Sequence, residues 1–146
     1  MADTRVQLEV EDWVRREWMK ECYGESFYRE RLPLVSGGYF DFDAVNSDKS
    51  FAATISTSGA KTASGKHAVG KLLKIRSDMY FLLLANVQRR LVVLTETDMY
   101  ELCQKEVAGG RVHRSIEFVH VEIPADLASR LKAARSTASK EVSPNA

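Results

Sequence analysis

Apolar residues recur at helical spacing near the start of the chain. Between Gln7 and Tyr23 they fall on every fourth position, with charged residues between them, and this spacing predicts an amphipathic helix. The apolar stripe consists of Val10, Val14, Trp18 and Cys22. Gly24 follows directly and is expected to end the helix, because glycine readily adopts the left-handed conformation found there.

Three segments after this helix predict a meander of strands. Each is rich in apolar and aromatic residues, and turn residues such as Ser36-Gly37-Gly38 separate one from the next. The segment 39–45 alternates most clearly between apolar and polar positions. The predicted strands cover residues 27–34, 39–45 and 50–57.

The second half of the chain predicts helices and buried strands in alternation. The continuous apolar run 79–85 is typical of a strand buried on both faces. The predicted order is helix 66–78, strand 79–85, strand 91–95, helix 97–107, strand 115–123 and a last helix from Pro124 or Asp126 to about Arg135. These elements together indicate an α/β fold, in which helices flank a mixed central sheet.

Length and composition are typical of one globular domain. The chain has 146 residues, of which 45% are hydrophobic, and we expect a single domain over 1–135 with a flexible tail over 136–146. The longest apolar run has seven residues, whereas a membrane helix needs about 20, so we expect no membrane span. Because no signal-peptide pattern is visible either, we expect a cytoplasmic protein. Cys22 and Cys103 are far apart and lack zinc-ligand spacing, which favours two buried, reduced thiols.

Charge is balanced over the whole chain but not along it. The 21 basic and 20 acidic residues give a net charge of +1, which excludes a global basic field for nucleic acid. The segment 50–77, however, contains no Asp or Glu. It is either a solvated face or a surface that contacts phosphate groups. Its basic residues are Lys61, Lys66, Lys71, Lys74 and Arg76, with His67 beside them.

Two aspartates stand out on the predicted strand 39–45. Asp41 and Asp43 are two positions apart, so in a regular strand they share one face, while Phe40 and Phe42 point to the other. Such a pair can hold Mg²⁺ or Mn²⁺ through carboxylate oxygens, or can simply form an exposed polar face.

A glycine-rich loop precedes the second predicted helix. Residues 59–66 nearly match the phosphate-binding P-loop, but five residues instead of four separate the glycines. His67 also replaces the magnesium-binding Ser or Thr, which argues against nucleotide hydrolysis. A simpler phosphate cradle with Lys61 and Lys66 remains a prediction, and plain turn formation is the alternative.

The order of elements and the aspartate-bearing strand resemble the PD-(D/E)XK nuclease superfamily, which has the restriction-endonuclease-like fold. The resemblance covers about residues 8–85. It implies that Asp43, with Asp41 as the alternative, is the first metal-binding acid. It also implies that Glu11, or Glu17, is the assisting glutamate of the first helix.

The sequence departs from that family at its second motif. Thr54-Ile55-Ser56 stands where the family has an acid-x-Lys triplet, so a metal-binding carboxylate and the catalytic lysine are both missing. Either a lysine has migrated, with Lys61, Lys66 or Lys71 reaching the site, or the site is inactive.

The sequence therefore predicts a divergent nuclease-like domain, inactive or altered, that contacts DNA or RNA through its basic segment. The expected contacts are Lys61, Lys66, His67, Lys71 and Lys74, and the expected catalytic set is Asp41, Asp43, Glu11, Lys61 and Lys66. One alternative is an active nuclease that uses Mg²⁺ or Mn²⁺ with a relocated lysine. Another is a homodimeric interaction module without chemistry, built on the apolar segments 79–85 and 91–94.

Overall fold

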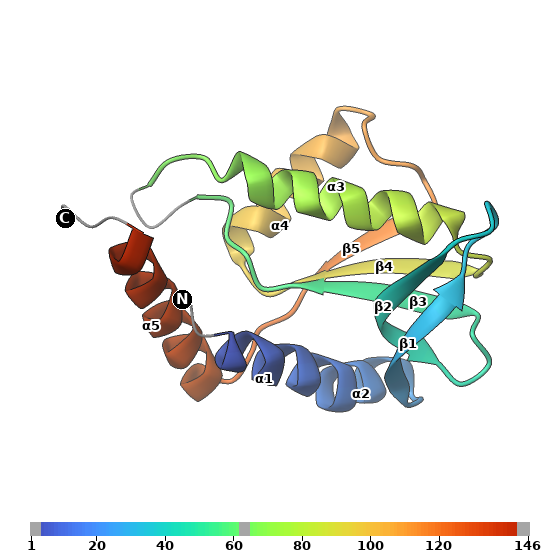
Figure 1. Ribbon diagram of the computed structural model, residues 1–146, viewed down its shortest axis with the longest axis horizontal. Coiled ribbons are helices and arrows are strands. Elements are labelled where there is room, and N and C mark those ends of the chain that lie inside the picture. The colour runs from blue at the N-terminus through green and yellow to red at the C-terminus, as the bar shows by residue number, and fades with distance from the viewer. Residues whose placement is uncertain (1–3, 62–64, 143–146) are drawn as a thin grey trace.

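A five-stranded mixed sheet forms the centre of the protein. The computed structural model describes residues 4–61 and 65–142. The strands lie in the order β1-β2-β3-β4-β5, in which β1–β2 and β2–β3 are antiparallel and β3–β4 and β4–β5 are parallel (Figure 1). The strands are β1 (Phe27–Pro33), β2 (Tyr39–Asn46), β3 (Phe51–Ser56), β4 (Arg89–Leu94) and β5 (Ile116–His120).

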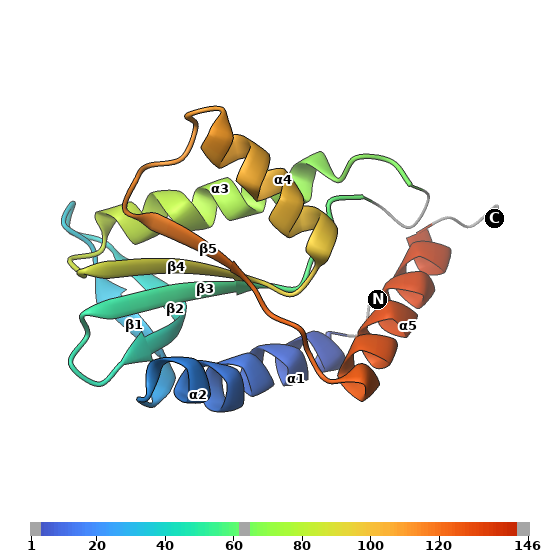
Figure 2. The ribbon, with the colours of Figure 1, turned by 180° about the vertical axis from the view of Figure 1, so that it is seen from behind.

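Helices cover both faces of this sheet, as expected for the α/β class. One face carries the N-terminal helix and α5, and the other carries α3 and α4 (Figures 1 and 2). Each face has its own apolar core, so the sheet is buried on both sides. The helical elements are α1 (Arg5–Trp13), η1 (Val14–Trp18), α2 (Met19–Tyr23), α3 (Val69–Leu84), α4 (Thr97–Ala108) and α5 (Ala125–Val142).

A π-helical turn shifts the apolar stripe of the N-terminal helix. The segment η1 has an i→i+5 pattern, which inserts one extra residue into the helix. Val14 is buried and the next buried residue is Met19, five positions later, in place of the predicted Trp18. Cys22 is consequently exposed, so the prediction of a buried thiol there was wrong. Cys103 is buried as predicted, and both cysteines are free.

The predicted strand 79–85 is wrong, because this run is the second half of α3. Ile75 and Leu82, seven residues apart, lie on one helical face and are both buried, whereas Tyr80 and Leu83 are exposed. The helix starts at Val69, three residues later than predicted. A homodimer formed by pairing segments 79–85 and 91–94 as free strands is therefore not supported, since residues 79–84 are helical and β4 lies inside the sheet between β3 and β5.

Two further boundaries differ from the predictions. β5 ends at His120, before the predicted end at residue 123, and α5 continues to Val142, past the predicted end at Arg135. Residues 143–146 of the predicted tail lie outside the described residues. In the ranges 4–61 and 65–142, none of the helices combines the length and apolar composition that crossing a membrane requires.

β2 and β3 separate near the middle of β2. Their paired residues are Ala44 with Ala53 and Val45 with Ala52, which leaves the first half of β2 paired with β1 alone. Side-chain alternation also breaks here, since Phe42 packs into the α3-side core whereas Ala44 packs into the α1-side core. Asp43 lies between them, where the two strands part.

Candidate functional site

An open cleft lies between α1 and α3, beside the point where β2 leaves β3. It has a volume of about 970 Å³ and is hereafter called the α1–α3 cleft. Its walls come from α1, from the end of β3 and the residues that follow, and from the start of α3. Its ionisable lining residues are Glu11, Asp43, His67, Lys71, Lys74 and Asp78.

Asp43 is held in this cleft by two backbone contacts. Its Oδ2 atom accepts the backbone N–H of Ile55 at 2.8 Å, so the carboxylate takes the place of a strand partner where the β2–β3 ladder has ended. The Nε atom of Arg15 donates to the backbone oxygen of Asp43 at 2.7 Å. Burial raises the pKa of the Asp43 carboxyl, although the Ile55 N–H opposes that shift.

Glu11, the glutamate that the family resemblance implies, lines the same cleft from α1. Burial raises the pKa of its carboxyl to about 6, and the negative charge of Asp43 adds to the shift. Arg15, Arg29 and Lys74 oppose it. Glu11 and Asp43 therefore act on each other electrostatically, which brings together two of the acids proposed from the family resemblance.

Lys74 and Asp78 add an ion pair from one turn of α3. The Nζ atom of Lys74 lies 2.6 Å from Oδ1 of Asp78. Asp78 is buried against the sheet, and this burial raises the pKa of its carboxyl, whereas Lys74 lowers it. Sequence reasoning did not select Asp78. Its i,i+4 spacing from Lys74 on a predicted helix was the available signal.

The other predicted cations divide into two groups. His67 and Lys71 line the cleft beside Lys74, whereas Lys61 and Lys66 are exposed and are not among its lining residues. The backbone of Lys61 pairs with that of His67, so these two residues lie side by side before α3 begins. Residues 62–64 of the predicted phosphate cradle lie outside the described residues.

Asp41 does not join Asp43. It is exposed and pairs with Arg31 of β1, whose Nε atom lies 2.9 Å from its Oδ1, and this arginine lowers the pKa of the Asp41 carboxyl. The expectation that the two carboxylates form one site is therefore not met. The reason is that β2 is paired only with β1 at Asp41 but reaches the cleft at Asp43. Glu17, the alternative to Glu11, is exposed and does not line the cleft.

The residues that stand at the acid-x-Lys triplet of the family, Thr54-Ile55-Ser56, carry no charged group. Ser56 lines the cleft, while Thr54 is only 2% exposed and its hydroxyl has no hydrogen-bond partner among the described residues. Within the same part of the chain, no three His, Cys, Asp or Glu side chains are grouped closely enough to hold a metal ion. The side chains as placed thus do not provide a three-ligand site, and Mg²⁺ or Mn²⁺ remains a prediction.

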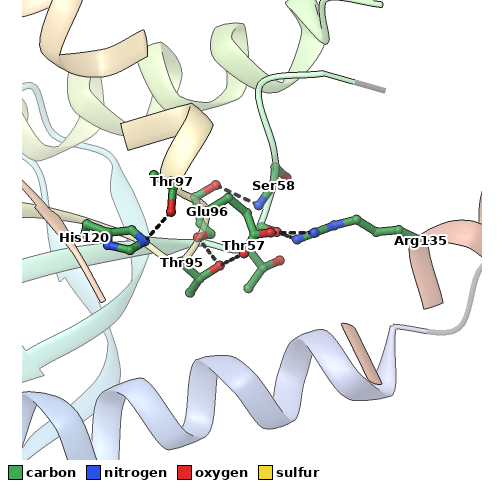
Figure 3. Close-up of polar contacts among 8 residues, drawn as sticks. Thr57, Ser58, Thr95, Glu96, Thr97, His120 and Arg135 are labelled. Atoms are coloured by element: carbon green, nitrogen blue, oxygen red, sulfur yellow. Dashed lines mark hydrogen bonds and ion pairs between the residues drawn. The ribbon is translucent and has the colours of Figure 1, made fainter. Parts of the chain in front are cut away.

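A second polar cluster lies at the carboxyl ends of β3 and β4 (Figure 3). Arg135 of α5 reaches Oε1 of Glu96 at 2.7 Å and also donates to the backbone oxygen of Thr57. Thr95 donates to Oε2 of Glu96 at 2.9 Å, and Thr97 lies 3.3 Å from Nε2 of His120. Because Arg135 and Glu96 neutralise each other, we interpret this cluster as a structural contact that holds α5 at the end of the sheet.

Comparisons with known protein families, curated proteins and solved structures give no match for this chain. The functional argument therefore rests on the geometry of the cleft.

Proposed function

We propose that this protein is a divergent, restriction-endonuclease-like domain that binds nucleic acid and holds a backbone phosphate at the α1–α3 cleft. One observation carries the proposal: His67, Lys71 and Lys74 line the same cleft as Glu11 and Asp43. The order helix, three antiparallel strands, helix, strand agrees with the nuclease-like interpretation, as does the position of Asp43 where β2 and β3 separate.

Two lysines of the cleft are accessible to a phosphate, although three acids also line it. Lys71 is exposed at its rim, and Lys74 keeps 70% of its side chain exposed although it pairs with Asp78. Both come from the acid-free segment, so no exposed carboxylate of that segment competes with a phosphate. Contacts between lysines and phosphates release counterions, which makes binding strongly dependent on salt.

The same geometry argues for binding without efficient cleavage. Hydrolysis of a phosphodiester by this class of nuclease needs a metal-activated water and relief of charge in the transition state. Thr54 and Ser56 offer neither a carboxylate nor an amine, and one oxygen of Asp43 is already bound to the Ile55 N–H. The cleft is therefore better equipped to hold a phosphate than to attack it.

Fluorescence anisotropy with labelled DNA and RNA tests the proposal. We expect binding that weakens steeply between about 50 and 200 mM salt. Lys71→Glu should weaken it at least severalfold, while the matched control Lys105→Glu, an exposed lysine at the end of α4, should not. The proposal fails if no nucleic acid binds at low salt, or if both substitutions have the same effect.

The second candidate is an active nuclease with a relocated lysine, and the position of Lys74 favours it. The positive charge of Lys74 acts on both Glu11 and Asp43, so an amine is present near the two acids although residue 56 is a serine. Cleavage in the presence of Mg²⁺ or Mn²⁺ that is lost in Asp43→Ala but kept in Asp41→Ala would establish this activity. Absence of cleavage of DNA and RNA with either metal would exclude it under those conditions.

A further inference from the structure

The side of α3 that faces away from the sheet is apolar. Four of its positions carry large apolar side chains that are between 36% and 61% exposed: Val69, Leu73, Tyr80 and Leu83. With Arg76 between them, they recur at intervals of four, three, four and three residues. This is the spacing of the a and d positions of a coiled coil, which form a seam along one side of a helix. These five residues are hereafter called the α3 outer stripe.

The outer stripe lies on the opposite side of α3 from its buried face. Ile75 and Leu82 hold the helix in the core, and a helical wheel with about 100° per residue puts them across the helix from the stripe. Surface helices of globular proteins ordinarily carry polar residues on the side away from the core. A contiguous apolar surface at that place is typical of an interaction site.

The stripe is separate from most of the α1–α3 cleft. Lys71 and Lys74 line the cleft, and of the stripe only Val69, at its N-terminal end, lines the cleft as well. Arg76 is the one charged residue of the stripe, and its side chain is 44% exposed although it pairs with Glu106 of α4 at 2.9 Å. None of the described helices and strands lies over the stripe, which is therefore accessible to another molecule (Figures 1 and 2).

The stripe is complementary to a second copy of itself. When two α3 helices run in opposite directions about a two-fold axis at the level of residue 78, residue 73 meets the partner's residue 83, because each lies five positions from the axis. Residue 76 meets the partner's residue 80 for the same reason. Leu73 then packs on Leu83 of the partner subunit, and the guanidinium of Arg76 lies over the ring of Tyr80 of the partner subunit. The one charge of the stripe thus meets an aromatic ring, and the remaining contacts are apolar.

We infer that the α3 outer stripe is a homodimer interface, in which two copies of this chain pair through antiparallel α3 helices. This interface differs from a pairing of free strands, since it uses the exposed face of a helix that is already formed. It leaves the lysines of the cleft uncovered. Because one pair of helices makes a small interface, the dimer should dissociate on dilution.

Sedimentation velocity of the full chain between about 1 and 500 µM tests this inference, since small interfaces dissociate in this range. The mass should rise with concentration from that of one chain toward twice that value. Leu73→Glu and Tyr80→Glu each place a carboxylate in the stripe and should keep the protein monomeric. The matched control is Tyr39→Glu, because Tyr39 is an exposed tyrosine of β2 outside the stripe. This variant should dimerise as the parent chain does, and circular dichroism checks the fold of each variant.

A cross-link tests the register and needs no charged substitution. Ser77 is exposed, borders the stripe and lies beside its own counterpart in the antiparallel arrangement. In a Cys22→Ala background, Ser77→Cys should form a covalent dimer when copper phenanthroline oxidises the two thiols to a disulfide. The parent chain is the control, since its exposed thiol, Cys22, lies on another helix and should form far less covalent dimer.

Two results would overturn the inference. One is a monomer at every concentration. The other is a dimer that both glutamate variants leave intact, since another surface would then hold it together. If those variants do not fold, the cross-link decides, and covalent dimer no greater through residue 77 than through Cys22 contradicts the interface. These experiments use no nucleic acid, so the inference and the proposed function can fail separately.

Discussion

The Asp43 carboxylate accepts the backbone N–H of Ile55 at 2.8 Å, at the point where β2 separates from β3. One side chain thus satisfies a backbone donor that the ladder leaves without a strand partner, and it also presents negative charge to the α1–α3 cleft. Burial raises the pKa of this carboxyl, so keeping it ionised at this position has an electrostatic cost.

Substitutions at Asp43 should separate its two roles. Asp43→Asn keeps an oxygen that can accept the Ile55 N–H, whereas Asp43→Ala leaves this donor without its partner. We expect Asp43→Ala to be less stable than Asp43→Asn by about 1–2 kcal/mol in urea unfolding. Asp41→Ala, at an exposed ion pair, should change stability by less than about 1 kcal/mol. Equal stability of the Ala and Asn variants would show that the Ile55 contact contributes nothing.

Glu11 should make the protein less stable as the pH rises. The pKa of its carboxyl is about 6 in the folded state, against an ordinary value of 4.5, so the folded state binds this proton more tightly than the unfolded state. The free energy of unfolding should therefore fall as pH increases from 4.5 through about 6. Glu11→Gln should be more stable than the parent chain at pH 7 and should lose this part of the pH dependence.

The control for this prediction is Glu17→Gln, because Glu17 is exposed on the same helix. It should leave the pH profile unchanged. A carbon-13 NMR titration of the Glu11 carboxyl measures the pKa directly, and a midpoint at or below 4.5 would contradict the burial argument.

The π-helical turn predicts which residue of the N-terminal helix matters for packing. Met19→Ala should lower the free energy of unfolding by about 2–5 kcal/mol, because Met19 is fully buried. Cys22→Ala should change it by less than about 0.5 kcal/mol, since Cys22 is exposed.

A thiol reagent provides an independent check of the same register. Native protein should react rapidly at Cys22 alone, because Cys103 is buried and this burial raises its thiol pKa to about 11. Rapid reaction of both thiols, or a large cost for Cys22→Ala, would mean that the apolar stripe continues without the π-helical shift.

The loop that precedes α3 provides a fourth prediction. Lys61 and Lys66 are exposed but do not line the cleft, so their charges act on a bound nucleic acid over a longer distance than Lys71 does. Lys61→Glu/Lys66→Glu should weaken binding at low salt and have little effect at high salt. The control Lys105→Glu/Lys132→Glu carries the same net charge, and an equal loss in that variant would mean that only total charge matters.

The sequence was sufficient for the class of fold, because periodicity reports directly which side of an element is buried. Helical spacing identified the first helix and Gly24 as its end, and the alternation over 39–45 identified β2. The run 79–85 was assigned wrongly to a strand, because a continuous apolar segment has no periodicity that distinguishes a buried strand from a helix. In the structure, Ile75 and Leu82 pack into the same core from one face of a helix, and this tertiary packing is not visible in the sequence pattern.

The site was harder to predict, because it depends on an irregularity that leaves no mark in the local pattern. A regular strand would place Asp41 and Asp43 together, but alternation breaks between Phe42 and Ala44 and β3 accompanies β2 only from Ala44 onward. Glu11 was selected only through a resemblance to a family, and its role stays a prediction. Asp78 was missed because burial of an acid next to a lysine is a tertiary property.

Chemical-shift mapping tests the central claim most directly. Nitrogen-15-labelled protein is titrated with a short single-stranded oligonucleotide, and shifts of the backbone amides are followed. The account predicts that the largest changes occur around the α1–α3 cleft, at Asp43, Ile55, Lys71 and Lys74. Changes confined to other surfaces, or none at saturating oligonucleotide, would contradict it.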